Sequence, residues 1–276
     1  MQKLSLTRIV GADDPVTASE FLAAFTTLSK NRIKDAMAKG AVWLKKSKHG
    51  QQRIRRARTA LKPGDRISIY YDGALLAIPP QRAQLISDQK RFSVWFKPVG
   101  LLSQGTKYGD HCSLLRQVEQ VYRPKRKVYL VHRLDREVSG LVLLAHDKTT
   151  AARMSDLFRK QDIIKRYAAR VRGNPAKSMP GGVIDIDLDG KPATTEFRVE
   201  IYEPAIDIST VHIEMGSGRK HQIRRHFDMI GHPVMGDPRY GKGNKNSEGM
   251  QLVATGLEFQ CPFKQKKQTF KTVAEF

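Results

Sequence analysis

The chain has 276 residues, 40% of them hydrophobic, and its 49 lysines and arginines against 27 acidic residues give a net charge of +22. This length and hydrophobic content exclude a mostly disordered chain and predict one large domain or two of ordinary size. The positive charge favours a polyanionic partner, either nucleic acid or an anionic membrane. The longest apolar run, Gly140–Ala145, is far shorter than the roughly 20 residues of a membrane-spanning helix, so we expect nucleic acid and no membrane.

Other compositional features predict a cytoplasmic protein without a bound metal or cofactor. The N-terminus has one early lysine and no extended apolar region, so we expect no secretory signal. The two cysteines, Cys112 and Cys261, form no CxxC pattern and fit a reducing compartment. The spacing of His221, His226 and His232 matches no common metal site. Glycine-rich nucleotide-binding loops are also absent from the sequence, which argues against ATP, NAD or a flavin.

The basic residues are concentrated in three stretches. Leu44–Arg66 contains nine basic residues and one acid, Tyr122–Arg136 contains six and one, and Arg219–His226 contains four and none. Each stretch by itself could be a solvated surface that aids solubility. Together, in so basic a chain, they indicate a surface that binds nucleic acid.

The N-terminal part of the chain predicts two short helices. Thr17-Ala-Ser-Glu20 has the pattern of a capping box before the apolar run Phe21–Phe25, which predicts a helix that ends near Leu28. Ser29 can cap a second helix, and Gly40 would end it. One apolar face of this second helix would carry Ile33, Ala36 and Met37.

Strand signals complete a small first domain. Ala41–Leu44 is apolar and β-prone, and the turn sequence Lys62-Pro-Gly-Asp65 leads into the strand candidate Arg66–Tyr71. We therefore predict a small α/β domain over residues 1–76. A pair of adjacent prolines disfavours helix and central strand, so residues 77–90 are predicted to be a linker.

Residues 91–276 are predicted to form a larger domain in which strands outnumber helices. The strand candidates are Phe92–Phe96, Tyr129–Val131, Gly140–Ala145, Ile163–Val171, Val183–Leu188, Thr194–Tyr202, Ile208–Met215 and Leu252–Phe259. Asp147 can cap one helix, and His221–Ile230 is predicted to be another, which ends before Gly231. Because strands and helices do not alternate regularly, we expect an α+β fold with a mixed or antiparallel sheet and flanking helices.

A carboxylate between arginines is the strongest chemical signal. Asp135 lies in the segment Val131–Gly140, directly before an apolar strand, with Arg133 and Arg136 close by in sequence. Burial favours a neutral acid, whereas nearby guanidinium groups favour the ion. We expect an ion that can act as nucleophile or base. A structural ion pair that holds a loop would produce the same local pattern.

A second cluster lies at the predicted helix His221–Ile230. Lys220 and Arg224 are spaced to share one face of a helix, and His221 and Arg225 share a neighbouring face. Such a helix can present cations to a phosphate or to a carboxylate. The alternative is a solvated basic helix without a partner.

These clusters are part of a longer series of motifs in a fixed order. The motifs are Lys97-Pro-Val-Gly100, His132-Arg-Leu-Asp135, Ser139-Gly140, Lys165-Arg-Tyr167, Gly218–His226, Gly231-His-Pro233 and Gly236–Gly241. Over residues 92–262 the chain thereby resembles the RluA-type family of pseudouridine synthases. The resemblance implies a pseudouridine synthase fold and an isomerase that detaches uracil from its sugar, rotates it and rejoins it through carbon. It also implies no cofactor and no metal, since nothing is added or lost.

The first domain carries a looser series of matches. These are Leu28–Lys34, Gly40-Ala-Val42 and Leu61–Ile67. With them the domain resembles the small RNA-binding domain named after ribosomal protein S-four. By that resemblance we expect Lys30 and Arg32 to contact RNA.

The family resemblance assigns catalytic roles to three residues. Asp135 is the essential carboxylate, and Arg224 is expected to be its ion-pair partner, with Arg219 as the alternative. Tyr167 is expected to stack on the target base, and its hydroxyl could assist the final proton removal. Without the resemblance, Tyr167 would be taken for a core aromatic residue of its strand.

The remaining predicted site residues are expected to bind RNA. A uridine in structured RNA must flip out to reach a buried carboxylate, and Arg133 would fill the vacated stack or hold the backbone. The other predicted contacts are His132, Lys165, Arg219, Lys220, His221 and Gln222. We expect a monomer that acts on ribosomal RNA, with transfer RNA as the next choice. The alternative is a non-catalytic RNA-binding or ribosome assembly factor that retains the fold.

Overall fold

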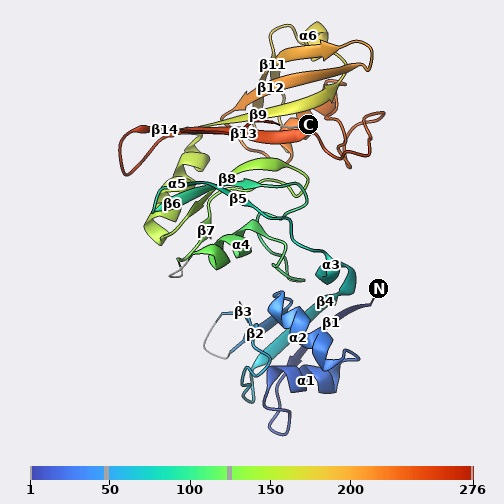
Figure 1. Cartoon of the computed structure of the whole chain (residues 1–276), viewed down its shortest axis with the longest axis vertical. Coiled ribbons are helices and arrows are strands. Elements are labelled where there is room, and N and C mark those ends of the chain that lie inside the picture. The colour runs from blue at the N-terminus through green and yellow to red at the C-terminus, as the bar shows by residue number, and fades with distance from the viewer. Residues whose placement is uncertain (1, 47–49, 123–125, 275) are drawn as a thin grey trace. The chain divides into compact units, whose positions relative to one another are not determined.

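The computed structural model (Figure 1) describes the chain except residues 1, 47–49, 123–125 and 275. The chain divides into two units, the first made of residues 1–81 and 104–120 and the second of residues 82–103 and 121–276. No helix in the described part of the chain is both long and apolar enough to cross a bilayer.

The first unit contains an antiparallel sheet of four strands in the order β1–β4–β2–β3. Its strands are β1 (Lys3–Ile9), β2 (Val42–Lys45), β3 (Gln52–Arg53) and β4 (Arg66–Asp72). Its helices are α1 (Ala18–Phe25), α2 (Lys30–Ala38), α3 (Gly73–Ala77) and α4 (Leu114–Val121). Strand β1 was not predicted, because it is an edge strand on which only Leu4 and Leu6 pack against the core.

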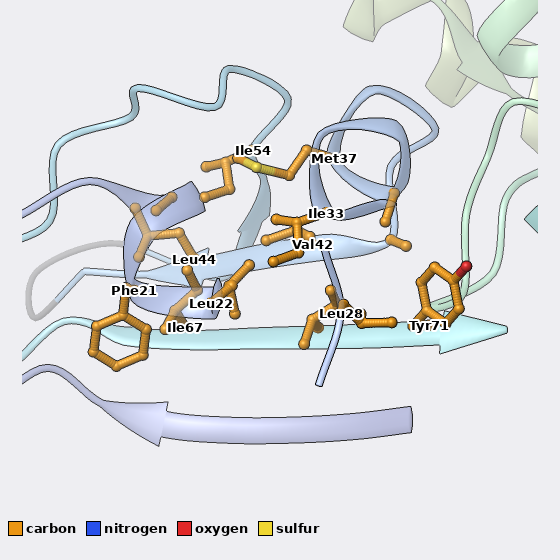
Figure 2. Packing of buried hydrophobic residues seen from close by; sticks show 14 of the residues in the cluster. Phe21, Leu22, Leu28, Ile33, Met37, Val42, Leu44, Ile54, Ile67 and Tyr71 are labelled. Carbon is orange, nitrogen blue, oxygen red and sulfur yellow. The ribbon is translucent and has the colours of Figure 1, made fainter. Parts of the chain in front are cut away.

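Helices α1 and α2 cover one face of this sheet and supply its core (Figure 2). The helix residues in this core are Phe21, Leu22, Ile33, Ala36 and Met37, and the strand residues include Val42, Leu44, Ile67 and Ile69. Side chains alternate between the two faces of a strand. Trp43 of β2 and Tyr70 of β4 therefore lie on the opposite face of the sheet from the helices.

The predicted side-chain caps at helix N-termini are confirmed at two of three positions. Ser29 accepts a hydrogen bond from the amide of Arg32 at the start of α2, and Asp147 accepts one from the amide of Thr150. The capping box at Thr17 is not formed, because the Thr17 hydroxyl donates to the Glu20 carboxylate at 2.6 Å and caps no amide of α1.

The second unit is built on a ten-stranded sheet. Eight of its strands follow the order β10–β11–β12–β9–β13–β8–β6–β5, and the other two, β14 and β7, pair with β13 and β8. Its strands are β5 (Gln84–Asp88), β6 (Phe92–Lys97), β7 (Tyr129–Leu130), β8 (Ser139–Ala145), β9 (Ile163–Arg172), β10 (Val183–Asp185), β11 (Thr194–Glu203), β12 (Ile208–Met215), β13 (Leu252–Gln260) and β14 (Lys267–Lys271). Its helices are α5 (Lys148–Lys160), α6 (Pro175–Ser178) and α7 (Gln222–Met229). The β8–β13 pair is parallel and the other described pairs are antiparallel, so the expected mixed sheet is confirmed.

Two segments differ from the predicted organisation. Within the expected linker 77–90, residues 84–88 form strand β5 and pair with β6, as in the pairing of Leu85 with Trp95. This strand is an exposed sheet edge, so it lacks the apolar alternation that predicts a strand. Residues 104–120, which fall in the predicted second domain, group with the first unit.

Candidate active site

Asp135 lies in the loop between β7 and β8, and this loop is anchored by backbone hydrogen bonds. The hydroxyl of buried Ser103 donates to the carbonyl of Leu134 at 2.7 Å and accepts from the amide of Leu134 at 3.1 Å. On the other side of Asp135, the carbonyl of Arg136 accepts from the amide of Gly100 at 2.8 Å. The peptide groups that flank Asp135 are therefore held by a separate segment of the chain.

The strand that follows this loop passes unusually close to β13. Gly140 has φ +118, and a Cβ atom there would lie 2.3 Å from the carbonyl oxygen of Ala254. Gly140 pairs with Ala254 on β13, and Ala254 pairs in turn with Tyr167 on β9. This row across three strands places Tyr167 next to the loop that carries Asp135, and only glycine permits the close approach.

Arg224 of α7 is the ion-pair partner of Asp135. Its Nη1 donates to Asp135 Oδ2 at 3.0 Å, while its Nε and Nη2 donate to the two carboxylate oxygens of Asp237 at 2.6 and 2.8 Å. Arg224 is only 3% exposed and Asp237 is fully buried. The Asp237 fork fixes the guanidinium group in the orientation that presents its remaining N–H group to Asp135.

Charge and hydrogen bonding keep the Arg224–Asp237 pair ionised despite burial. Burial opposes the charged form of Arg224, but the bonds to Asp237 and Asp135 outweigh it and raise the pKa of Arg224. Burial likewise opposes ionisation of Asp237, yet Arg224 and the amides of Arg239 and Tyr240 lower its pKa. Asp135 therefore faces a permanent cation.

His221 approaches the same oxygen of Asp135 that accepts a hydrogen bond from Arg224. It has φ +53 at the position before α7, and its Nε2 is 3.6 Å from Asp135 Oδ2. Its Nδ1 lies 2.9 Å from the hydroxyl of Tyr240. Burial lowers the pKa of His221, with Asp135 opposing and Arg224 adding to that effect, so the ring is neutral at neutral pH.

Tyr167 and Lys97 are two further ionisable groups near Asp135. Burial, reinforced by the charge of Asp135, raises the pKa of Tyr167, so its phenol keeps its proton at neutral pH. Lys97 is fully buried, and its ammonium donates to the carbonyls of Leu101 at 2.8 Å and Pro98 at 3.2 Å. Burial lowers the pKa of Lys97 to about 8, although Glu137 and Asp135 oppose this shift.

Three residues predicted to contact RNA make hydrogen bonds within the protein. Lys165 donates to the carbonyls of Gly216 and Ser217 at 2.6 and 2.5 Å, and burial lowers its pKa to about 8. Gln222 accepts from the amide of Arg219 at 3.0 Å and donates to the carbonyl of Thr194 at 2.9 Å. Both residues therefore hold the loop that leads into α7.

His132 is the third of these residues. Its Nε2 accepts a hydrogen bond from the amide of Leu143 at 2.9 Å, and its ring stacks on Phe158 at 4.2 Å. Burial, with a smaller contribution from the charge of Lys165, lowers the pKa of His132 to about 3. A neutral ring that accepts from backbone anchors the segment before Asp135.

The other predicted RNA contacts remain accessible. Arg133 and Lys220 are exposed, and Arg219 is half-buried, with its Nε donating to the carbonyl of Pro192 at 3.2 Å. Arg219 is therefore not the partner of Asp135. Lys30 and Arg32 are exposed on α2 of the first unit.

Sequence reasoning gave no role to several residues that build this site. Asp237 and Tyr240 both lie in the motif Gly236–Gly241, so the motif itself was a usable signal. Lys97 likewise belongs to a motif that was noted without a role. Ser103 lies in no motif, and only its contact with Leu134 reveals its importance.

Comparison with known proteins identifies the class to which this fold and site belong. The family model described as RNA pseudouridylate synthase matches residues 91–229. The dual-specificity RNA pseudouridine synthase RluA of Escherichia coli (strain K12) is 30% identical over 72% of this chain and 97% of its own length. An uncharacterized RNA pseudouridine synthase of Aquifex aeolicus (strain VF5) is 28% identical over 92% of this chain and 91% of its own.

Solved structures agree on the fold. Human RNA pseudouridylate synthase domain containing 4 superposes with a TM-score of 0.57 at 22% identity, over 70% of this chain and 88% of the other. The chain therefore belongs to the RNA pseudouridylate synthase family, as the motifs predicted, and it is an isomerase that acts on RNA. RluA-type enzymes are among its relatives.

Proposed function

We propose that this protein converts a uridine of structured RNA to pseudouridine with Asp135 as the catalytic carboxylate. The observation that carries the proposal is the bond from Arg224 to Asp135 Oδ2, with Arg224 itself held by Asp237. The Asp135 side chain is 28% exposed. Among the described residues its Oδ1 makes no hydrogen bond, which leaves one oxygen of a fixed carboxylate for the substrate.

Tyr167 supplies the surface on which the target base is held. Because its raised pKa keeps the phenol neutral, it acts by stacking and by hydrogen bonding and is a poor general base in the free enzyme. Exposed Arg133, which is two residues from Asp135, fills the stack that the flipped uridine leaves or holds the backbone. Lys220 and Arg219 bind phosphates near α7.

The class of RNA substrate is inferred from the first unit. The first unit, proposed to be a domain of the S-four type that binds RNA through Lys30 and Arg32, favours ribosomal RNA, with transfer RNA next. The dual specificity of the Escherichia coli relative recommends testing both. A cytoplasmic location and a monomeric state remain predictions from the sequence.

The decisive experiment compares wild-type protein with Asp135→Asn on total cellular RNA. Pseudouridines are mapped by carbodiimide labelling, and RNA affinity is measured in parallel. We expect a new pseudouridine with wild type and none with Asp135→Asn, at equal RNA affinity, because asparagine retains the shape of the side chain and removes its charge. Exposed Asp187 provides the matched control, and Asp187→Asn should be fully active. If neither wild type nor control modifies RNA that both bind, the non-catalytic RNA-binding factor becomes the better account.

A further inference from the structure

The sheet face of the first unit that α1 and α2 leave uncovered carries aromatic and basic side chains. Trp43 of β2 lies opposite Arg53 of β3, and the Arg53 guanidinium stacks over the Trp43 ring at 4.1 Å. Lys45 lies opposite Arg66 in the next row of this face. Tyr70 of β4 completes the set and is partly exposed.

A tight turn from a distant part of the chain is fastened onto this face. Residues 106–109 close a turn in which the amide of Thr106 donates to the carbonyl of Gly109 at 2.9 Å and the amide of Gly109 donates back at 3.1 Å. Arg53 donates to the carbonyl of Thr106 at 2.5 Å, and Trp43 Nε1 donates to the carbonyl of Lys107 at 3.0 Å. The two residues at the tip of the turn, Lys107 and Tyr108, are thereby held at the sheet.

Lys107 is placed between two tyrosine rings. Its ammonium lies 5.0 Å from the ring centre of Tyr70 and 5.1 Å from that of Tyr108, and the two rings are 6.1 Å apart at 75°. We call this surface the tyrosine face. It consists of Trp43, Lys45, Arg66, Tyr70, Lys107 and Tyr108.

The charge of the tyrosine face is uncompensated. Lys45, Arg66 and Lys107 are exposed, and none of them forms an ion pair with a carboxylate of the described chain. A surface that served only to fasten the turn would need Trp43 and Arg53 and would not need three free cations beside two tyrosines. Aromatic rings interleaved with free cations are what proteins use to bind unpaired nucleic acid, since bases stack on rings and phosphates pair with cations.

We propose that the tyrosine face binds unpaired nucleotides of the RNA substrate, with a base stacked on Tyr70 or Tyr108 and phosphates held by Lys45, Arg66 and Lys107. The inference rests on the proposed function in one respect, that RNA is what the protein binds. The face is distinct from Lys30 and Arg32, because α2 packs on the other side of the same sheet. It adds affinity without taking part in the chemistry at Asp135.

The first test is photocross-linking of the full chain to a single-stranded RNA that contains 4-thiouridine, followed by mass spectrometry of the cross-linked peptides. We expect cross-links on peptides that contain Tyr70 or Tyr108. Tyr70→Leu combined with Tyr108→Leu should weaken binding of this RNA roughly tenfold, which corresponds to the loss of one base–ring stack. The matched variant, Tyr70→Phe with Tyr108→Phe, retains the rings and should bind like wild type. Lys107→Gln should reduce the salt slope of log affinity by roughly 0.7.

The outcomes separate this inference from the proposed function. If Asp135 is catalytic and the tyrosine face binds RNA, the double leucine variant raises KM for substrate RNA and leaves kcat unchanged, because the contact is equal in ground and transition states. Cross-links at Tyr70 or Tyr108 in a protein that makes no pseudouridine would support the tyrosine face and defeat the catalytic proposal. An active enzyme whose leucine and phenylalanine variants bind equally well, with cross-links elsewhere, would overturn the inference. Melting temperatures of both variants show whether a loss of binding reflects a loss of fold.

Discussion

Arg224 and Asp135 are 89 residues apart in the chain, yet the Arg224 guanidinium donates to the Asp135 carboxylate at 3.0 Å. The same guanidinium forms a two-pronged contact with fully buried Asp237. Asp237 thus positions Arg224, and Arg224 positions Asp135. A carboxylate held in this way is fixed beside a buried cation before the substrate arrives, which is the preorganisation that a catalytic carboxylate needs.

Replacement of Arg224 by lysine should impair catalysis although it preserves the charge. Lysine cannot form the planar fork to Asp237 while donating to Asp135, so Asp135 loses its fixed position. We expect kcat to fall about 100-fold with little change in KM, as is typical when a reacting group is misplaced. Steady-state kinetics on the RNA identified by mapping gives both constants.

The neighbouring arginine provides the control. Arg225 lies on the same helix and pairs with exposed Asp189, so Arg225→Lys should leave both constants unchanged. If Arg224→Lys were as active as Arg225→Lys while Asp135→Asn remained inactive, the ion pair would not be what positions the carboxylate.

Removal of the Ser103 hydroxyl should loosen the loop that carries Asp135. Ser103→Ala leaves the buried amide and carbonyl of Leu134 without their partner, at a cost of about 1–3 kcal/mol in the free energy of unfolding. We expect kcat to fall as well, since the loop then has more than one conformation. Ser113 is also buried and bonds to a backbone carbonyl, but in the first unit. Ser113→Ala should reduce stability without reducing kcat, and an equal loss of kcat in both variants would refute the positioning role.

Gly140 should tolerate no side chain. A Cβ atom would lie 2.3 Å from the Ala254 carbonyl oxygen, and φ is +118, so Gly140→Ala has to separate β8 from β13. We expect a loss of more than about 3 kcal/mol in unfolding free energy, measured by urea denaturation. Gly231 has φ +81 but open space around it, so Gly231→Ala should cost only about 1–2 kcal/mol. Equal costs at the two positions would show that the strand contact matters little.

His132 should make the protein less stable in mild acid. Burial lowers the pKa of His132 from 6.5 to about 3. At a pH between these two values, His132 is protonated in the unfolded chain and neutral in the folded protein. Its contribution to stability is complete above pH 6.5 and decreases as the pH falls, by roughly 1.4 kcal/mol per pH unit.

Comparison with His132→Gln isolates this contribution. The glutamine oxygen reaches the position of Nε2 and can still accept from the amide of Leu143, and glutamine does not titrate in this range. Between pH 7.5 and 5.5 the wild type should lose about 1.4 kcal/mol more than the variant. Other histidines with lowered pKa values, including His146, are common to both proteins and cancel. Parallel pH dependence of the two proteins would mean that His132 is not buried as a neutral ring.

Local features of the site and fold were predictable because they depend on neighbours in sequence. The caps at Ser29 and Asp147 follow from side-chain type and position, and the buried run of β8 follows from its apolar residues. The capping box at Thr17 failed although its pattern was correct, because Glu20 took the hydroxyl as its own partner. The edge strands β1 and β5 were missed because exposed strands carry little apolar pattern.

Which polar side chains of the motifs are bonded within the protein could not be predicted from the motifs. His132, Lys165 and Gln222 stand among motif residues with the same appearance as exposed Arg133 and Lys220, yet they point inward to backbone partners. A polar side chain forms a hydrogen bond within the protein where a buried backbone carbonyl or amide would otherwise have no partner. Which backbone groups these are is decided only when the strands and loops pack.

The amino-acid sequence by itself determined the class of protein: a basic α+β chain whose ordered motifs mark an RNA pseudouridine synthase and single out Asp135. Such conclusions depend on residue type and on short spacings along the chain, and both can be read directly from the sequence. The pairing of Asp135 with Arg224, the support from Asp237 and Ser103, and the assembly of the tyrosine face required the fold. Their partners come from segments tens of residues apart, and strand register and backbone approach, as at Gly140 and Ala254, decide which of many possible partners meet.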